Sequence, residues 1–350
     1  MTSVCILGAG VMGSAMAMPF SDRGMNVRLV GTHLDGAIID SIKGSGRHPK
    51  LNITMPAGLQ AFHPGQLAEA IGDDTDLILL GVASGGVAWA IEKLAFVLTR
   101  PIPIVMITKG MKPEPDTLRA LPDVVAEGLK ARLGFAVPIA AIAGPCIAGE
   151  LAAKRPTGTV IVSRDLGLAA RLAKAFSGDY YHPRAFMDMM GVEVCAAFKN
   201  FFAIAVGWAH GRNDVMDKTE NQARNNNAAA ILFDQSVREL LVLTKALGGS
   251  SESVWGMPGV GDLYVTCQAG RNSRLGNALG RGLTYAEAKA GPLKDETVEG
   301  AELGIAVAGS IHAMVASDKI AAVEIPLTLA MLKSLTEGKI FEPEWALFHR

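Results

Sequence analysis

The sequence predicts an α/β protein of two domains, in which a doubly wound sheet domain is followed by an all-helical domain. Three observations support this fold class. The 350 residues are too many for one ordinary compact core. Short apolar runs alternate with helical patterns in the first half, whereas the second half contains almost only helical patterns. A glycine-rich turn also separates the first apolar run from the first helical pattern.

The strands of the first domain are expected where apolar, often β-branched residues run together for three to six positions. These segments are Val4–Leu7, Val27–Val30, Leu77–Val82, Ile104–Thr108, Val137–Ile142 and Val160–Val162, and a helix over Val11–Arg23 follows the first of them. Strands that are apolar throughout are typical of parallel sheets with both faces covered by helices. We therefore expect a parallel sheet between two layers of helices.

The alternation stops near Tyr181, where His182-Pro183-Arg184 is typical of a boundary. We place the first domain at residues 1–183 and the second at residues 184–350. Helices of the second domain are expected at Met187–Trp208, Ala228–Leu247, Asn272–Gly280, Tyr285–Ala290, Ala301–Ala316 and Leu327–Leu335. A cleft between two such domains is the usual place for a small-molecule site.

Composition argues against several classes of partner. The net charge of −1 does not favour nucleic acid or an acidic membrane surface. The apolar run Val192–Ala209 contains Glu193, Lys199 and Asn200, which are costly in lipid, so we expect a buried core helix rather than a membrane span. The four cysteines lack the spacing of a metal site, and such scattered thiols are typical of a reduced, cytoplasmic protein without a metal.

The segment Gly8-Ala9-Gly10-Val11-Met12-Gly13 matches the pattern G-x-G-x-x-G between a strand and a helix. This is the context of the Rossmann dinucleotide-binding loop, in which the backbone approaches a pyrophosphate at a helix N-terminus. The expected cofactor-binding residues of this loop are Gly8, Gly10, Val11, Met12 and Gly13. An ordinary strand–helix turn without a ligand is the alternative.

The end of the second strand bears on the choice of cofactor. Val30-Gly31-Thr32-His33-Leu34-Asp35 has no acidic residue at the strand tip, where NAD enzymes usually bind the ribose hydroxyls. We expect Asp35 to cap the next helix and Thr32 and His33 to contact the cofactor. An uncharged tip can accept a 2′-phosphate, which favours NADP and leaves NAD open.

Three basic positions stand out in the sequence. Lys109 follows a strand of the sheet, at the edge where ligands bind in open α/β folds, although a solvated lysine is the alternative. Lys199 lies in an apolar helix, where a lysine is paired, extended to the surface or functional. Arg271 and Asn272 follow Gly270 at a predicted helix start, where an anion can bind, unless the arginine is merely solvated.

These motifs together resemble the soluble NAD(P)-dependent glycerol-3-phosphate dehydrogenases, over nearly the whole chain and in the same order. Besides the glycine loop, the resemblance rests on Thr108-Lys109-Gly110, Ala143-Gly144-Pro145, Glu193-Val194-Cys195, Lys199-Asn200, Gly261-Asp262-Leu263, Thr266-Cys267, Gly270-Arg271-Asn272 and Val298-Glu299-Gly300. It implies hydride transfer between NAD(P) and a small phosphorylated alcohol or ketone, and a homodimer.

The resemblance also implies roles for individual residues. Lys199 corresponds to the proton acceptor, with Lys109 and Asp262 as its catalytic neighbours. The implied substrate-binding residues are Lys109, Gly144, Asn200, Thr266, Arg271 and Asn272. The implied cofactor contacts outside the glycine loop are Lys109, Ala148, Arg271 and Glu299.

Three departures from the family pattern bear on which substrate is used. Cys146 replaces a serine or threonine, Asn225-Asn226-Asn227-Ala228-Ala229 lacks a basic residue, and Val82-Ala83-Ser84-Gly85 lacks a Pro-Ser-His element. We expect sn-glycerol 3-phosphate and dihydroxyacetone phosphate, with a different phosphorylated polyol or a hydroxy acid as alternatives. A non-catalytic nucleotide sensor is disfavoured because Lys199 and Asp262 are both present.

Overall fold

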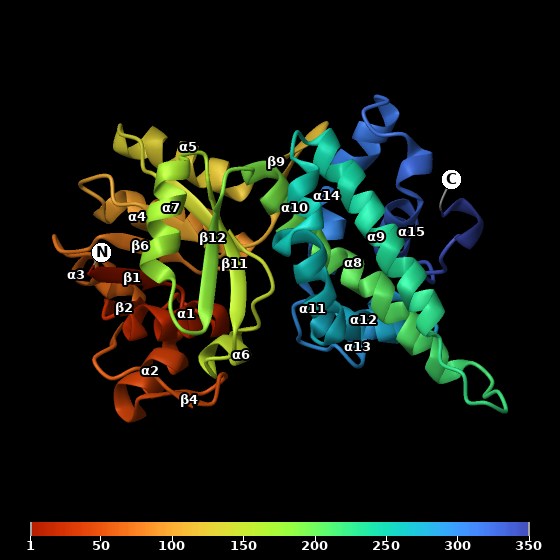
Figure 1. Cartoon of the computed structure of the whole chain (residues 1–350), viewed down its shortest axis with the longest axis horizontal. Helices are drawn as coiled ribbons and strands as arrows, with labels where there is room; N and C mark the ends of the chain where they lie inside the picture. The colour runs from red at the N-terminus through yellow and green to blue at the C-terminus, as the bar shows by residue number, and fades with distance from the viewer. Residues whose placement is uncertain (1, 349–350) are drawn as a thin grey trace. The chain divides into compact units, whose positions relative to one another are not determined.

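The computed structural model describes residues 2–348, which form two compact units (Figure 1). The first unit comprises the chain up to Lys109 together with Leu121–Met189, and the second comprises Gly110–Ala120 and the chain from Met190 onward. The expectation of one boundary after residue 183 therefore differs from this division, in which the chain passes between the units three times.

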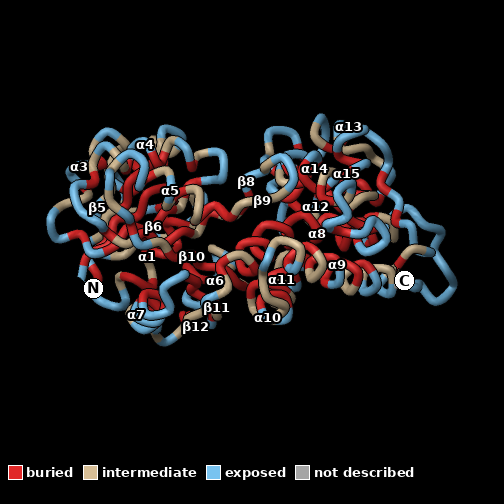
Figure 2. Tube along the Cα trace, turned by 90° about the horizontal axis from the view of Figure 1, so that it is seen from above, coloured by how far each residue is buried: buried red, intermediate tan, exposed pale blue. Residues whose placement is uncertain are grey.

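Within the described residues, the first unit contains one eight-stranded sheet in the order β12-β11-β10-β7-β6-β1-β2-β5. Its strands are β1 (Ser3–Leu7), β2 (Asn26–Val30), β5 (Gln60–Phe62), β6 (Leu77–Leu80), β7 (Ile104–Met106), β10 (Ile139–Ala143), β11 (Thr157–Ser163) and β12 (Tyr181–Phe186). The expected strands are all present to within a few residues. The central strands are buried throughout, which explains their uninterrupted apolar sequence (Figure 2).

Helices join these strands as a doubly wound fold requires. They are α1 (Val11–Asp22), α2 (Gly36–Ser45), α3 (Leu67–Ala70), α4 (Val87–Val97), α5 (Leu121–Leu133), α6 (Ala148–Ala152) and α7 (Leu166–Phe176). One core cluster joins side chains of α1, α2 and α7, including Phe20, Ile39 and Phe176, whereas α4 and α5 pack against each other. The prediction of a doubly wound, helix-covered sheet is confirmed, and its strands are parallel except for one pair.

One strand pair departs from the parallel pattern, because β10 and β11 are antiparallel. The connection between them contains α6, a five-residue helix that rises about 7.5 Å. The seven-residue β11 spans about 23 Å, so this helix covers only about a third of the length of the strand, unlike the long helices that connect parallel strands. The chain therefore reverses direction at this point.

The expected boundary at His182-Pro183-Arg184 lies inside β12, so the interpretation of this tripeptide as the end of the sheet domain is corrected. β12 pairs in parallel with β11 and is the last strand on its side of the sheet. An edge strand tolerates proline because the missing N–H can belong to the side without a partner. Pro183 marks an edge here rather than a boundary.

Two small hairpins were not predicted. β3 (Arg47–His48) pairs with β4 (Ile53–Thr54) in the first unit, and β8 (Met111–Glu114) pairs with β9 (Thr117–Ala120) in the second. Strands of two to four residues are too short to show a period of two. The β8–β9 hairpin adds Met111 and Leu118 to the core of the second unit.

The second unit is otherwise helical, as expected. Its helices are α8 (Met189–Val215), α9 (Asn226–Ala246), α10 (Ser251–Trp255), α11 (Asp262–Gln268), α12 (Arg271–Gly280), α13 (Tyr285–Ala290), α14 (Glu299–Ala316) and α15 (Pro326–Glu337), with a π-helical turn η3 (Met257–Gly261) before α11. By length and composition, α8 could cross a membrane. However, 94% of the apolar 18-residue stretch of this helix is buried inside the protein. This confirms the core-helix interpretation.

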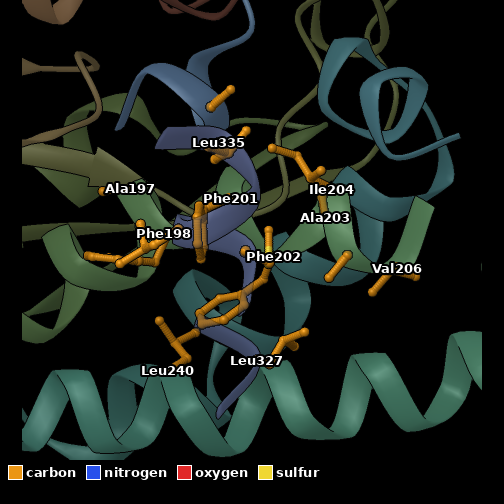
Figure 3. Packing of buried hydrophobic residues seen from close by; sticks show 14 of the residues in the cluster. Ala197, Phe198, Phe201, Phe202, Ala203, Ile204, Val206, Leu240, Leu327 and Leu335 are labelled. Atoms are coloured by element: carbon orange, nitrogen blue, oxygen red, sulfur yellow. The ribbon is translucent and has the colours of Figure 1, made fainter. Parts of the chain in front are cut away.

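The core of the second unit is built around α8. Phe198, Phe201 and Phe202 project from this helix, and the last two rings meet edge to face with centroids 5.4 Å apart. Figure 3 shows them beside Leu240 of α9 and Leu327 of α15. Such packing explains why nearly every residue of α8 before Ala209 is apolar.

Glycines bring α8 and α12 into backbone contact. Gly207 and Gly211 lie one turn apart on α8, and Gly276 and Gly280 lie one turn apart on α12. A Cβ added at Gly211 would overlap the carbonyl oxygen of Asn277, and Cβ atoms at the other three positions would likewise collide with backbone. We call these four residues the glycine contact; it fixes α12 against the helix that carries Lys199.

Candidate functional site

The glycine loop has the geometry expected of a dinucleotide site. Gly8 has φ +117°, and a Cβ there would lie 2.6 Å from the carbonyl oxygen of Gly81. A Cβ at Gly13 would overlap the carbonyl oxygen of Gly8, so α1 can begin against β1 only with glycine at this position. A Cβ at Gly10, in contrast, would have no neighbour within 4 Å. The space beside Gly10 is open, which fits the approach of a pyrophosphate to the first turn of α1.

Asp35 occupies the N-cap position of α2, but its side chain makes no capping hydrogen bond. Its Oδ2 instead accepts hydrogen bonds from the backbone N–H of Thr32 at 2.8 Å, from the Thr32 hydroxyl at 2.8 Å and from the N–H of Ala9 at 3.2 Å. The expectation that Asp35 caps the helix is thus correct for its position and wrong for its side chain. The reason is that the tip of β2 and the glycine loop offer three donors at once.

The two predicted cofactor contacts at the tip of β2 differ in exposure. Thr32 is half-buried and donates to Asp35, whereas His33 is exposed, with its ring 6.1 Å from that of Trp89 on α4. The Val82–Gly85 departure follows β6 and leads into α4, the helix that carries Trp89. The Thr108 hydroxyl donates to the carbonyl oxygen of Val82 at 2.8 Å and holds this loop.

The remaining predicted residues of the first unit follow its central strands. Lys109 comes three residues after β7, and Gly144, with φ +125°, comes directly after β10. Ala148 begins α6, and the half-buried Cys146 lies just before it. β7 and β10 are parallel neighbours, so these residues follow the same edge of the sheet as the glycine loop.

Lys199 and Asp262 form a buried ion pair in the second unit. The Lys199 ammonium, at the middle of α8, donates to Oδ1 of Asp262, the first residue of α11, and the side chains are 7% and 1% exposed. A buried lysine keeps its charge only beside such a partner. The predicted neighbourhood of Lys199 and Asp262 is therefore present, and it also agrees with the alternative that Lys199 is paired.

A hydrogen-bonded network lies beside this pair. Asn272 donates from Nδ2 to Oδ1 of Asn200 at 3.1 Å, and its own Oδ1 accepts the N–H of Gly300 at 2.9 Å. Asn200 donates to one carboxylate oxygen of Glu299 at 3.3 Å, while Arg271 donates to the other at 3.2 Å. Four predicted residues from three helices are thus linked through side chains.

Two helix N-termini converge on this network. α12 begins at Arg271 after Gly270, which has φ +111°, and α14 begins at Glu299. The first N–H groups of a helix have no acceptor in the helix and favour an anion. With Arg271 beside them, the second unit holds the elements of a phosphate site.

Thr266 and Cys267 follow Asp262 along α11. The Thr266 hydroxyl donates to the carbonyl oxygen of Asp262 at 2.6 Å, which leaves its lone pairs to accept a bond from a ligand. Burial raises the pKa of Cys267 to about 12, although the positive charge of Lys199 opposes this. Cys267 therefore stays a thiol at neutral pH and is not a nucleophile.

The structure places the predicted residues in two groups. The second unit brings together Lys199, Asn200, Asp262, Thr266, Arg271, Asn272 and Glu299, and the first unit holds Gly8, Gly10, Val11, Met12, Gly13, Thr32, His33, Lys109, Gly144 and Ala148. The expectation that Lys109 acts beside Lys199 stays a prediction.

The departure at Asn225–Asn227 lies outside the Lys199 network. Asn226 and Asn227 are exposed at the start of α9, and Asn225 donates to the carbonyl oxygen of Ala209 at 3.2 Å. A cavity of about 900 Å³ lies nearby, lined by residues of α8, α9, α11 and α12 that include His210 and Phe233. Its lining includes none of the predicted catalytic or substrate residues.

Sequence reasoning missed His48, and it gave Gly300 only as part of a motif, without a role. His48 is fully buried, and its Nε2 lies 3.1 Å from the carbonyl oxygen of Ala9 in the glycine loop. Gly300 supplies the N–H that orients Asn272 and lets α14 approach α8, because a Cβ there would overlap the carbonyl oxygen of Asn200. Neither role has a local signal, because the contacts on which it depends, His48 with Ala9 and Gly300 with Asn272, join residues at least 28 positions apart.

Comparison with known proteins agrees with this arrangement. The model for the N-terminus of NAD-dependent glycerol-3-phosphate dehydrogenase matches residues 3–169, and the model for the C-terminus matches residues 188–344. The NADP(+)-dependent glycerol-3-phosphate dehydrogenase of Archaeoglobus fulgidus is 33% identical over 285 residues, which cover 81% of this chain and 82% of the relative. The glycerol-3-phosphate dehydrogenase [NAD(P)+] of Halorhodospira halophila is 34% identical over 316 residues, 89% and 87% of the two chains.

Solved structures are similar over the whole chain. The glycerol-3-phosphate dehydrogenase of Coxiella burnetii has a TM-score of 0.80 at 28% identity, covering 99% of this chain and 97% of that one. The Saccharomyces cerevisiae enzyme has a TM-score of 0.81 at 18% identity, covering 100% and 99%, which supports the fold alone.

Proposed function

This chain belongs to the NAD-dependent glycerol-3-phosphate dehydrogenase family, NAD(P)-dependent oxidoreductases that act on CH–OH groups, and we propose that it interconverts sn-glycerol 3-phosphate and dihydroxyacetone phosphate. The observation that supports this substrate best is the buried Lys199–Asp262 pair beside the network of Arg271, Asn272 and Asn200. It combines a proton-transferring amine with donors for a phosphate.

The predicted site residues of the second unit then have separate roles in the reaction. In its neutral form Lys199 takes the proton of the substrate hydroxyl at Nζ during oxidation, and its ammonium returns this proton during reduction, while Asp262 holds the amine in place. Arg271 and the N–H groups at the start of α12 bind the phosphate, while Glu299 orients the arginine. The nicotinamide cofactor, when bound, supplies or accepts the hydride.

We further propose that NADP is the preferred cofactor. The tip of β2 carries no acidic residue, and the carboxylate of Asp35 is bonded to the glycine loop. The Archaeoglobus fulgidus relative is named as an NADP(+)-dependent enzyme. We also propose a cytoplasmic homodimer, whose assembly is tested by light scattering of the purified protein.

The proposed substrate is tested by following oxidation of NADPH and NADH with a panel of ketones. Dihydroxyacetone phosphate should be reduced, whereas unphosphorylated dihydroxyacetone and keto acids should be reduced at least a hundredfold more slowly at equal concentration, because a charged phosphate contact is lost. Faster reduction of a keto acid or of another phosphorylated ketone would replace the proposed substrate.

A further inference from the structure

The glycine loop is braced on both sides of Ala9. Its N–H donates to Oδ2 of Asp35 at 3.2 Å, and its carbonyl oxygen lies 3.1 Å from Nε2 of His48. The first contact comes from the start of α2. The second comes from the β3–β4 hairpin, where His48 lies 39 residues after Ala9. Both polar backbone atoms of Ala9 are therefore held from outside the loop.

The hydrogen bonds of His48 define its protonation. The N–H of Leu51 donates to Nδ1 at 3.1 Å, so the proton of the neutral ring is on Nε2 and is donated to Ala9. Burial lowers the pKa of His48, which keeps the ring neutral at physiological pH. The hairpin is thus anchored to the glycine loop by a buried hydrogen bond that does not depend on charge.

This anchor holds the hairpin that carries Lys50 against the glycine loop. Lys50 lies two residues after His48 in the exposed turn of the hairpin, and its charge acts on the His48 ring. Asp35 also lies within electrostatic range of that ring. The neighbouring Arg47 is engaged elsewhere, because its guanidinium donates to Oδ1 of Asn52 at 2.9 Å and braces the hairpin.

The carboxylate nearest the glycine loop, that of Asp35, is engaged by donors of the protein itself. Asp35 Oδ2 accepts three hydrogen bonds from Thr32 and Ala9, and each of these donors offsets part of its charge. The exposed His33 at the tip of β2 carries no negative charge either. Besides this hydrogen-bonded carboxylate, the hairpin and the tip of β2 carry the exposed Lys50 and His33, neither of which is negatively charged.

We propose that Lys50, held beside the glycine loop by the His48 anchor, binds the 2′-phosphate of NADP and makes the enzyme prefer NADP to NAD. The inference rests on the assignment of the glycine loop as the dinucleotide site. A dianionic phosphate pairs with an exposed ammonium, which acts as a point charge with three donors. NAD has a hydroxyl at this position and gains nothing from Lys50.

The test is calorimetric binding to the full-length protein, with 2′,5′-ADP and 5′-AMP as probes that differ only in the 2′-phosphate. Lys50→Ala should weaken 2′,5′-ADP and NADP about tenfold or more and change 5′-AMP and NAD less than about twofold. Lys50→Arg should retain most of the preference. Lys43→Ala, which removes another exposed lysine of the first unit bonded to Gln66, is the matched control and should change neither.

Two results would overturn the inference. Unchanged binding of 2′,5′-ADP to Lys50→Ala would mean that another group receives the phosphate, and an equal loss for 2′,5′-ADP and 5′-AMP would mean that Lys50 only supports the loop. Both binding results can be distinguished from a failure of the proposed function, which is tested by the reduction of ketones. A wild-type protein that binds 2′,5′-ADP through Lys50 but does not reduce dihydroxyacetone phosphate would retain the inference and lose the substrate.

Discussion

In the first unit the residues that we propose to bind the pyrophosphate come from one stretch of six residues, whereas in the second unit Lys199 meets Asp262 across 63 residues and Asn200 meets Asn272 across 72. The first site is made of backbone and open space, and the second of buried side chains. A backbone site is set by the local turn, but a side-chain site needs the helices that carry it to pack in one way. We therefore expect substitutions in the two units to fail differently.

The largest effect should follow from Lys199→Ala. General acid–base catalysis contributes about 10²–10⁴-fold, so turnover should fall by at least a hundredfold while the dissociation constant of NADP, which we assign to the first unit, stays within about twofold. Steady-state kinetics and calorimetry measure the two quantities. Lys333→Ala, an exposed lysine of α15, is the control. Near-normal turnover of Lys199→Ala would remove it from the proton-transfer role.

Gly211→Ala should test how strictly the second unit depends on helix packing. The added methyl overlaps the Asn277 carbonyl, so the free energy of unfolding should fall by about 3 kcal/mol. Gly309→Ala on α14 is matched to it, because a Cβ there meets nothing within 4 Å, and it should stabilise by about 0.5–1 kcal/mol. Urea unfolding measures both. Equal effects would show that the glycine contact is not required.

Gly10→Ala should separate binding from stability in the first unit. Gly10 has φ −64° and ψ 170°, which alanine adopts freely, and its Cβ would enter open space. The melting temperature should stay unchanged, while the dissociation constant of NADP rises about tenfold or more because the methyl occupies the pyrophosphate space. Gly13→Ala should instead lower the melting temperature. Unimpaired NADP binding by Gly10→Ala would argue against the loop as the cofactor site.

The smallest effects should be opposite responses to pH. The folded pKa of His48 lies below its ordinary value of 6.5, so its contribution to stability should be complete above pH 6.5 and fall as the pH falls. Burial raises the pKa of Glu239 to about 7 from 4.5, although hydrogen bonds from Gln235 and from the N–H groups of Leu327 and Thr328 oppose the shift. Stability from Glu239 should therefore fall as the pH rises from about 4.5 to 7.

Difference curves measure these contributions. The free energy of unfolding of wild type minus that of His48→Gln should rise with pH toward 6.5, and the same difference for Glu239→Gln should fall between pH 4.5 and 7. Curves of the same sign would contradict the assigned environments.

Local patterns were sufficient for the sheet and the long helices, because buried strands and helices repeat apolar residues at their own periods. They failed at Pro183, where an edge strand tolerates a residue typical of boundaries, and at the two-residue strands of the β3–β4 hairpin. The family resemblance supplied most of the site. The Asp35 and His48 contacts to Ala9 and the role of Gly300 depend on segments 26 to 39 or 100 residues apart, for which a single sequence carries no signal.

The path of the β8–β9 hairpin has a consequence for biosynthesis. During translation this hairpin leaves the ribosome long before α14, whose Ser310 hydroxyl donates to the Glu114 carbonyl oxygen 196 residues earlier in the chain. Met111 and Leu118 therefore stay without their final neighbours until most of the polypeptide has been made. A nascent chain stalled near residue 189 should expose this apolar segment to chaperones even when the sheet of the first unit has already formed.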